Sequence, residues 1–310
     1  MANKALIIGA NGQDGRLLNL LLESKNYEIY NVSSSSNTDF KNYLQFNLAT
    51  SNFDELNNFI LKIKPHEIYY VAAYHHSSIQ SKSTNFDFIN KSIQVNQLGF
   101  INIMELCKAS LPLTKIIYTS SSLIFSGAKN QIQTEETTTE PRCIYSITKS
   151  AASEAAKYYR NEFNLFVSIG IMYNHESIYR KDYFLSKKIV TEVREIIDKK
   201  RDKIIIGSLT SETDWGYAPD YVEALWLILQ QENPDNYIVA SSNKHIVKDW
   251  FLVLSNYLNT NLLSYVEENP GLIQRKKPVL IGNNSKLKAI GWKAKTSFEE
   301  MVIKMYNNVI

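Results

Sequence analysis

The stretch Ala5-Leu-Ile-Ile8-Gly9-Ala-Asn-Gly12-Gln-Asp-Gly15 is the strongest indication of the fold in this sequence. A short apolar run is followed by three glycines, and then by Leu17, Leu18, Leu21 and Leu22 at helical spacing. This order predicts a strand, a tight glycine turn and a helix. In that context the glycines let the backbone approach a pyrophosphate at the amino end of the helix. The stretch therefore predicts a dinucleotide site, although the same glycines elsewhere would form an ordinary turn.

The alternation of short apolar runs and helical patterns continues along the chain. We expect further strands at residues 27–32, 67–71, 115–118 and 166–172, and helices at 53–63, about 93–109 and 145–162. Repeated βα units are typical of an α/β protein with a Rossmann-type doubly wound parallel sheet. After about Asn174 the pattern changes to longer helices and short strands, which predicts a smaller C-terminal substrate-binding lobe. We expect the sheet domain at 1–173, with returning segments from about 210–245, and the lobe mainly at 174–310.

The composition excludes several classes of protein. A chain of 310 residues with 44% hydrophobic residues is long enough for one large α/β unit or two cooperating domains. A net charge of +3 and dispersed lysines do not form the basic stripe of a nucleic-acid-binding protein. Cys107 and Cys143 lie far apart, and no His/Cys/Asp cluster has metal-ligand spacing. No apolar run approaches ~20 residues, and no signal peptide is evident, so we expect a cytoplasmic protein without a membrane partner, disulfide or metal.

A candidate acid–base pair lies in Ile144-Tyr-Ser-Ile-Thr-Lys149. Tyr145 and Lys149 are four residues apart and share one face of the expected helix. A nearby ammonium lowers the pKa of a phenol, which can then exchange protons with a hydroxyl. Ser121 belongs to a serine run directly after an expected strand, a position that lies over the cofactor in this fold. Without this context, Tyr145 and Lys149 would be an ordinary pair on a helix surface. The serine run would likewise be an ordinary polar strand end.

The end of the second expected strand bears on the choice of cofactor. Its sequence, Tyr30-Asn-Val-Ser-Ser-Ser-Ser36, carries neither the acid that binds a ribose 2′-hydroxyl nor the arginine that accommodates a 2′-phosphate. The serines and Asn31 can hydrogen-bond a hydroxyl, whereas a phosphate dianion would lack a cationic partner. We therefore expect NAD in preference to NADP; a lysine such as Lys41 that turned inward would reverse the choice.

Longer strings complete a resemblance to a known family. They are Gly12-Gln-Asp-Gly15, Tyr173-Asn-His-Glu-Ser177, Asp214-Trp-Gly216, Asp220-Tyr-Val-Glu-Ala-Leu-Trp226, Gln230-Gln-Glu232, Gly291-Trp and Lys295-Thr-Ser-Phe-Glu-Glu300. Together they resemble the GDP-mannose 4,6-dehydratases, which are extended short-chain dehydrogenase/reductases, over nearly the whole chain. The resemblance implies a GDP-sugar, usually of the manno configuration, bound beside the nicotinamide. It also implies a homodimer or homotetramer.

The resemblance assigns roles to individual residues. The catalytic residues would be Tyr145, Lys149 and Ser121. The cofactor would be bound by Gly9, Asn11, Gly12, Gln13, Asp14, Gly15, Ser34, Asn47, Leu48, Ala72, Ala73, Tyr145, Lys149 and Met172. The substrate would be bound by His76, Ser121, Ser122, Leu123, Asn174, Glu176, Lys188 and Arg275. For Arg275, beside two lysines, a solvated basic turn is an equal alternative. His75 and His76 could orient a substrate, relay protons or form structural hydrogen bonds.

Three departures from the family matter. The arginine cluster that the dehydratases use for NADP is missing after the second strand, and Thr213 replaces an arginine before Asp214. The third is Leu123, where the family has the glutamate that takes the C5 proton and protonates the leaving C6 hydroxyl. An alkyl side chain does neither, and loss of a general acid or base typically costs a factor of about 100 to 10,000 in rate. We therefore expect oxidation at C4 of a GDP-hexose or GDP-heptose without dehydration.

Three other functions remain open. A substitute acid, with Glu135, Glu136 or His76 nearest by family position, would keep the 4,6-dehydratase activity. The same tyrosine chemistry in reverse would give a 4-ketoreductase. A non-catalytic protein that binds a sugar nucleotide and regulates a partner is the third, and the retained Tyr145 and Lys149 argue against it.

Overall fold

The computed structural model describes residues 2–36, 39–50, 52–75, 86–273 and 278–310. Its centre is a seven-stranded sheet in the order β11-β7-β5-β4-β1-β2-β3, in which every neighbouring pair is parallel. The strands are β1 (Lys4–Ile8), β2 (Glu28–Ser33), β3 (Tyr43–Gln45), β4 (Glu67–Tyr70), β5 (Lys115–Ser121), β7 (Val167–Met172) and β11 (Asn236–Val239). The strand order reverses between β1 and β4, the point at which such sheets bind ligands at their carboxyl edge. The doubly wound parallel sheet expected from the sequence is confirmed.

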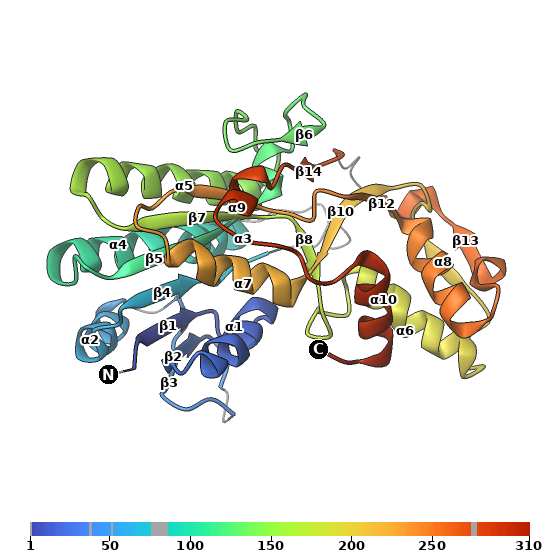
Figure 1. Cartoon of the computed structure of the whole chain (residues 1–310), viewed down its shortest axis with the longest axis horizontal. Helices are drawn as coiled ribbons and strands as arrows, with labels where there is room; N and C mark the ends of the chain where they lie inside the picture. Colours follow the sequence, from blue (N-terminus) through green and yellow to red (C-terminus); the bar gives the residue numbers. More distant parts are fainter. Residues whose placement is uncertain (1, 37–38, 51, 76–85, 274–277) are drawn as a thin grey trace.

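Helices cover both faces of this sheet (Figure 1). On one face α1 (Gln13–Ser24) packs against α7 (Ala218–Leu229), and on the other α4 (Gly99–Ser110) packs against α2 (Asp54–Ile63) and α5 (Ile144–Phe163). The central strands are buried on both faces because helices cover each side, which explains why β1, β4 and β5 read as continuous apolar runs.

The remaining elements form a smaller body at one end of the sheet (Figure 1). Its strands are β8 (Asn174–Glu176), β9 (Ile204–Ile206), β10 (Glu212–Tyr217), β12 (Lys244–Ile246) and β13 (Val266–Glu268). Its helices are α6 (Leu185–Ile197), α8 (Val247–Leu258) and α10 (Phe298–Asn307). Their apolar faces meet in a second hydrophobic cluster, centred on Trp250, Phe251 and Val302, that is separate from the cluster of the sheet.

Two segments from the second half of the chain return to the main cluster. The first comprises α7 and β11, whereas the preceding β10 pairs with β8 and β12 in a sheet of its own. The second brings Leu280, Leu287 and Trp292, around β14 (Ile281–Gly282) and α9 (Ser285–Ala289), against the same cluster. In addition, β14 pairs with β6 (Ile132–Gln133). The expected return over about 210–245 therefore corresponds to residues 218–240, and the sequence did not indicate the second return.

The helix expected from about residue 93 begins earlier. It starts as α3 (Phe86–Ile93), passes through a π turn at Gln94–Leu98 and continues as α4. Tyrosine hydroxyls from the sheet take two of the turn's carbonyls: Tyr70 donates to Val95 and Tyr118 donates to Asn96. These tertiary hydrogen bonds satisfy groups that a wider turn leaves without their usual helical partners, and they cannot be read from local periodicity.

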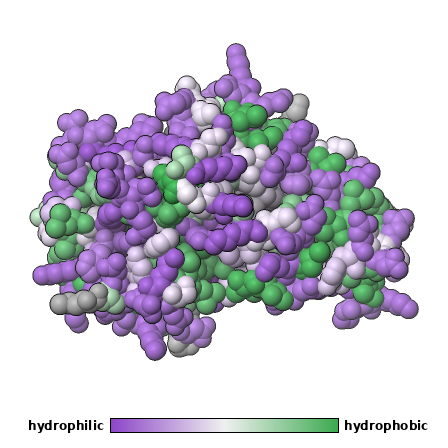
Figure 2. All heavy atoms as spheres, in the orientation of Figure 1, coloured by the Kyte–Doolittle hydropathy of each residue, from purple (hydrophilic) through white to green (hydrophobic). Residues whose placement is uncertain are grey.

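The surface is mainly hydrophilic on the face shown in Figure 2, with hydrophobic residues in small scattered groups. Within the described ranges, no helix combines the length and the apolar character that a membrane span requires.

Candidate active site

The glycine turn between β1 and α1 has the geometry of a nucleotide cradle. Gly9 adopts φ +103°, and a Cβ at this position would lie 2.6 Å from the backbone nitrogen of Ala72. A Cβ on Gly15 would lie 2.6 Å from the Cα of Ala10 and would also overlap the carbonyl oxygen of Gly9. Glycine is therefore required for conformation at one position and for close approach at the other. The turn leads directly into α1, whose first backbone N–H groups suit a pyrophosphate.

The other residues expected to bind the cofactor lie at the same carboxyl edge of the sheet. Each follows or ends a parallel strand: Ser34 after β2, Asn47 and Leu48 after β3, Ala72 and Ala73 after β4, and Met172 at the end of β7. Asn11, in the glycine turn, donates through Nδ2 to the Ser35 hydroxyl at 2.8 Å and to the Tyr43 hydroxyl at 3.1 Å. The turn thus positions the segment after β2, where the adenosine ribose would lie. These residues fit a dinucleotide.

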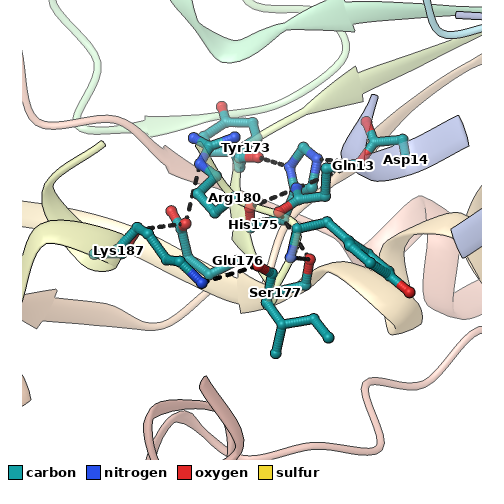
Figure 3. Close-up of polar contacts among 11 residues, drawn as sticks. Gln13, Asp14, Tyr173, His175, Glu176, Ser177, Arg180 and Lys187 are labelled. Atoms are coloured by element: carbon teal, nitrogen blue, oxygen red, sulfur yellow. Dashed lines mark hydrogen bonds and ion pairs between the residues drawn. The ribbon is translucent and has the colours of Figure 1, made fainter. Parts of the chain in front are cut away.

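The first turn of α1 is bonded to the strand that enters the smaller body (Figure 3). Asp14 and His175 form an ion pair with Oδ1 and Nε2 2.9 Å apart. Gln13 donates through Nε2 to the carbonyl oxygen of His175 at 3.0 Å, and the Ser177 hydroxyl donates to Gln13 Oε1 at 3.0 Å. The side chains of both expected cofactor residues are therefore engaged with the segment that follows β7.

The charges of this pair stabilise each other. Burial opposes ionisation of Asp14, but the charge and hydrogen bond of His175 outweigh it, so the pKa of Asp14 is lowered. Burial likewise acts to lower the pKa of His175, and the carboxylate of Asp14 outweighs that effect and raises it. A charged pair therefore joins the nucleotide turn to the strand β8.

Tyr145 lies in the first turn of α5, and its neighbours set its ionisation. Burial raises its pKa to about 12, although the hydrogen bond of Ser121 and the charge of Arg180 act to lower it. Ser121 ends β5, and its oxygen also accepts the backbone N–H of Leu123 at 3.3 Å. The sequence led us to expect a lowered pKa. The difference arises from desolvation of the phenol, which periodicity does not reveal.

Lys149 points towards the end of β5. It is 1% exposed, its Nζ donates to the carbonyl oxygen of Thr119 at 2.7 Å, and this nitrogen lies 5.8 Å from the centroid of the Tyr145 ring. Burial lowers the pKa of Lys149 to about 7, against the opposing charge of Asp14. The expected pairing of Tyr145 and Lys149 on one helical face is present, but the ammonium is not prominent among the causes that shift the pKa of Tyr145.

Asn96, which the sequence did not single out, connects the π turn to α5. Its Nδ2 donates to Thr148 Oγ1 at 3.0 Å and to the carbonyl oxygen of Tyr74, while its Oδ1 accepts the backbone N–H of Tyr74 at 2.8 Å. The residue therefore fixes α5 against the loop after β4. No spacing rule would identify a buried asparagine within a helix.

Leu123 stands in the short 3₁₀ helix Ser122–Phe125 directly after β5. Its side chain is partly buried and packs against the main hydrophobic cluster. The two carboxylates considered as substitutes, Glu135 and Glu136, line a cavity of about 290 Å³ that Ile124 and Phe125 of the same 3₁₀ helix also line, and whose lining does not include Tyr145 or Ser121. Glu135 Oε1 also accepts the backbone N–H of Ile238 at 2.9 Å.

The residues expected to contact substrate are spread over the segment after β7. Asn174 is exposed at the start of β8, and Lys188 of α6 donates through Nζ to the carbonyl oxygen of Ile205 at 2.6 Å. Glu176 is 2% exposed, and its Oε2 accepts the Ser186 hydroxyl at 2.6 Å and lies 3.1 Å from Arg180 Nε. His76 and Arg275 lie outside the described residues. Ser122 is buried beside Leu123.

An aromatic stack, also missed by the sequence analysis, reaches Tyr145 from the loop before α6. The rings of His75 and Tyr145 meet edge-on with centroids 4.6 Å apart, and Phe184 stacks on His75 at 5.7 Å. Arg180 lies over the Phe184 ring at 3.7 Å. Within the described ranges, no group of three His, Cys, Asp or Glu side chains is arranged to hold a metal ion.

The comparisons with known proteins agree with this arrangement. The family of GDP-mannose 4,6 dehydratases matches residues 6–305. GDP-mannose 4,6 dehydratase 2 of Arabidopsis thaliana is 33% identical over 97% of this chain and 85% of its own. The GDP-mannose 4,6 dehydratase of Homo sapiens is 29% identical over 98% of this chain and 90% of its own.

Among solved structures, the dTDP-glucose 4,6-dehydratase of Bacillus anthracis in complex with NAD has a TM-score of 0.81 at 21% identity, covering 99% of this chain and 96% of its own. The UDP-glucose 4-epimerase of Thermus thermophilus, complexed with NAD, has a TM-score of 0.81 at 17% identity, covering 98% of each chain; these two share the fold. On the family match and the sequence identity, the chain belongs to the GDP-mannose 4,6-dehydratase family.

Proposed function

We propose that the protein oxidises the C4 hydroxyl of a GDP-manno-type sugar, a hexose or a heptose, and releases the 4-keto sugar nucleotide without dehydration. The observation that carries this proposal is Leu123, which packs its alkyl side chain against the main cluster beside Ser121 and Ser122. Family membership supports the GDP-sugar, since the relatives named above are GDP-mannose 4,6 dehydratases.

The residues around Tyr145 divide the work of the oxidation. Tyr145 accepts the proton of the C4 hydroxyl, and Ser121, which hydrogen-bonds Tyr145, binds the same sugar oxygen. Lys149, buried below them, would bind the nicotinamide ribose and fix the orientation of the ring. The nicotinamide, when bound, supplies the hydride acceptor.

Dehydration needs a further acid–base group close to C5 and C6 of the sugar. Leu123 accepts and donates no proton. Glu135 and Glu136 line a cavity that is not lined by Tyr145, Ser121 or Leu123, and the hydrogen bond from the backbone N–H of Ile238 holds Glu135 there. Their placement favours a reaction that ends at the ketone over one that continues with a substitute carboxylate.

NAD is the cofactor that the chain's residues favour. The residues directly after β2, Ser34–Ser36, offer hydroxyl groups to a ribose and no guanidinium to a 2′-phosphate. Asn11 binds Ser35 and so holds this segment beside the glycine turn.

A 4-ketoreductase is the second candidate, and the protonation state of Tyr145 is compatible with it. With a pKa raised to about 12 by burial, the phenol is protonated at neutral pH, and this is the form that donates a proton to the oxygen of a ketone. The residues are the same in both directions, so the two functions differ in which sugar nucleotide and which redox form of the nicotinamide are supplied.

Mass spectrometry of products distinguishes the reactions. The purified protein is incubated with NAD and a panel of GDP-hexoses and GDP-heptoses, and we expect a product lighter by two hydrogens. Loss of water from the wild-type product would overturn the proposal. Leu123→Glu should form some product that has lost water. The matched control is Leu123→Gln, because glutamine has the shape of glutamate but no ionisable proton, and this variant should form no such product.

A further inference from the structure

The loop between β8 and α6 holds an arginine in a fixed position. Arg180 Nε lies 3.1 Å from Glu176 Oε2, and the side chains of the two residues are 17% and 3% exposed. The guanidinium carbon lies 3.7 Å from the centroid of the Phe184 ring. A carboxylate thus orients the cation from one side and an aromatic face supports it from another, a combination that favours arginine over lysine.

The support of Arg180 extends to the catalytic tyrosine. Phe184 stacks on His75 at a centroid distance of 5.7 Å with an interplanar angle of 27°, and the His75 ring meets the Tyr145 ring edge-on at 4.6 Å. Both supports of Arg180 come from residues 176–184, whereas Tyr145 comes from α5. The stack therefore connects the loop before α6 to the phenol across the site.

Several charged or titratable groups face Tyr145 from the elements around it. Asp14 comes from α1, Cys143 and Lys149 from the start of α5, His75 from the loop after β4, and Arg180 from the loop before α6. Lys149 is bound to the Thr119 carbonyl, and burial lowers its own pKa to about 7. The charge of Arg180 acts to lower the pKa of Tyr145, whereas the charge of Asp14 acts to raise it.

We infer that Arg180 is a positioning residue for the chemistry of Tyr145: Glu176 and Phe184 hold its guanidinium as the permanent cation that favours the phenolate. This role is the one that the sequence alone assigns to Lys149. The inference rests on the proposed function only in that Tyr145 is the proton acceptor. It also gives the loop before α6 a role in catalysis, because any movement of that loop moves the cation.

The ionisation of residue 145 can be followed without substrate or cofactor. A difluorotyrosine placed at position 145 has a lower intrinsic pKa than tyrosine, so that fluorine NMR can follow its titration in the folded protein. We expect Arg180→Met to raise the titration midpoint by about one unit, since an opposite charge close to a group shifts its pKa by about 1 to 3 units. Arg180→Lys should give a smaller rise, because lysine keeps the charge but cannot share both supports.

Two comparisons keep this test decisive. Lys181→Met removes the neighbouring exposed cation and should leave the midpoint unchanged. If Arg180→Met also leaves it unchanged while Lys149→Met raises it, Lys149 is the relevant cation and the inference is wrong. Thermal unfolding of each variant shows whether the fold is intact, and Arg180→Gln replaces Arg180→Met if the latter does not fold.

Kinetics provide the second readout. With the GDP-sugar that the wild type oxidises, Arg180→Met should lose about tenfold in kcat at a fixed pH below the phenol pKa, with little change in KM, because one pKa unit changes the phenolate fraction about tenfold. The loss should shrink as the pH rises towards the phenol pKa, because the phenolate fraction of the variant then approaches that of the wild type. A loss of the same size at every pH would indicate a structural role and overturn the inference. If the wild type oxidises no GDP-sugar, the proposed function fails, and the NMR titration still decides the role of Arg180.

Discussion

The ion pair between Asp14 and His175 should contribute most to stability in a defined pH window. The pKa of His175 is raised above its ordinary value of 6.5, so its contribution is complete below that pH and is lost as the pH rises through the raised pKa. The pKa of Asp14 is lowered below 3.8, so its contribution is complete above that pH and is lost as the pH falls through the lowered value. The pair should therefore be strongest between these two ordinary values.

The geometry sets the size of the effect. The two side chains are 18% and 11% exposed, and their charged atoms lie 2.9 Å apart, so solvent screens them little. A hydrogen bond to a charged group contributes about 1.5–3 kcal/mol, and a neutral one about 1 kcal/mol. We expect a coupling energy of about 2 kcal/mol near pH 6, which falls towards the neutral value as the pH rises well above the His175 pKa.

A double-mutant cycle measures this coupling. Asp14→Asn, His175→Asn and the double variant are unfolded in denaturant at pH 6 and again at pH 9, and the bond of His175 to the Tyr173 carbonyl cancels in the cycle. The matched control is the pair His245–Asp249, whose atoms are 3.5 Å apart and whose side chains are 22% and 32% exposed; we expect it to couple by less than about 1 kcal/mol. A coupling energy between Asp14 and His175 that is the same at both pH values would contradict a charged pair that becomes neutral as the pH rises.

Two further predictions concern the nucleotide turn and the phenol. Gly15→Ala places a Cβ against Ala10 and the Gly9 carbonyl, so NAD binding measured by calorimetry should weaken at least tenfold; unchanged affinity would mean that the turn is not the cofactor cradle. Ser121→Ala removes a hydrogen bond that lowers the pKa of Tyr145, so the alkaline rise of the oxidation rate should move to higher pH, and a shift to lower pH would contradict the assigned role of Ser121.

The parts of the molecule with local signals were predictable from the sequence. Strand β1 and the helix that contains Tyr145 and Lys149 follow from apolar runs and helical spacing, and the glycine turn follows from its place between a strand and a helix. The serines at the end of β5 were predictable because the sheet brings strand ends to one edge. Most of the expected cofactor residues lie at that edge for the same reason.

The parts that depend on tertiary contacts were not predictable. Gln13 and Asp14 meet His175 and Ser177 across more than half the chain, and no local pattern indicates which side chains a nucleotide turn will bond. The π turn between α3 and α4 accepts a hydrogen bond at the Val95 carbonyl from the Tyr70 hydroxyl, which reaches it from the sheet. The raised pKa of Tyr145 depends on burial, which spacing cannot report.

The protonated state of Tyr145 does not by itself decide between oxidation and ketone reduction. A catalyst accelerates both directions of one step, so a phenol with a pKa of about 12 slows the oxidation at neutral pH without moving its equilibrium. The equilibrium moves because oxidation of the hydroxyl releases a proton, and each pH unit favours the ketone by about tenfold, or about 1.4 kcal/mol. The function in the cell therefore depends on how the reduced nicotinamide is consumed, whereas Leu123 acts on both directions alike. Under the proposed function, neither direction includes the loss or the return of water, because an alkyl group stands in place of the acid.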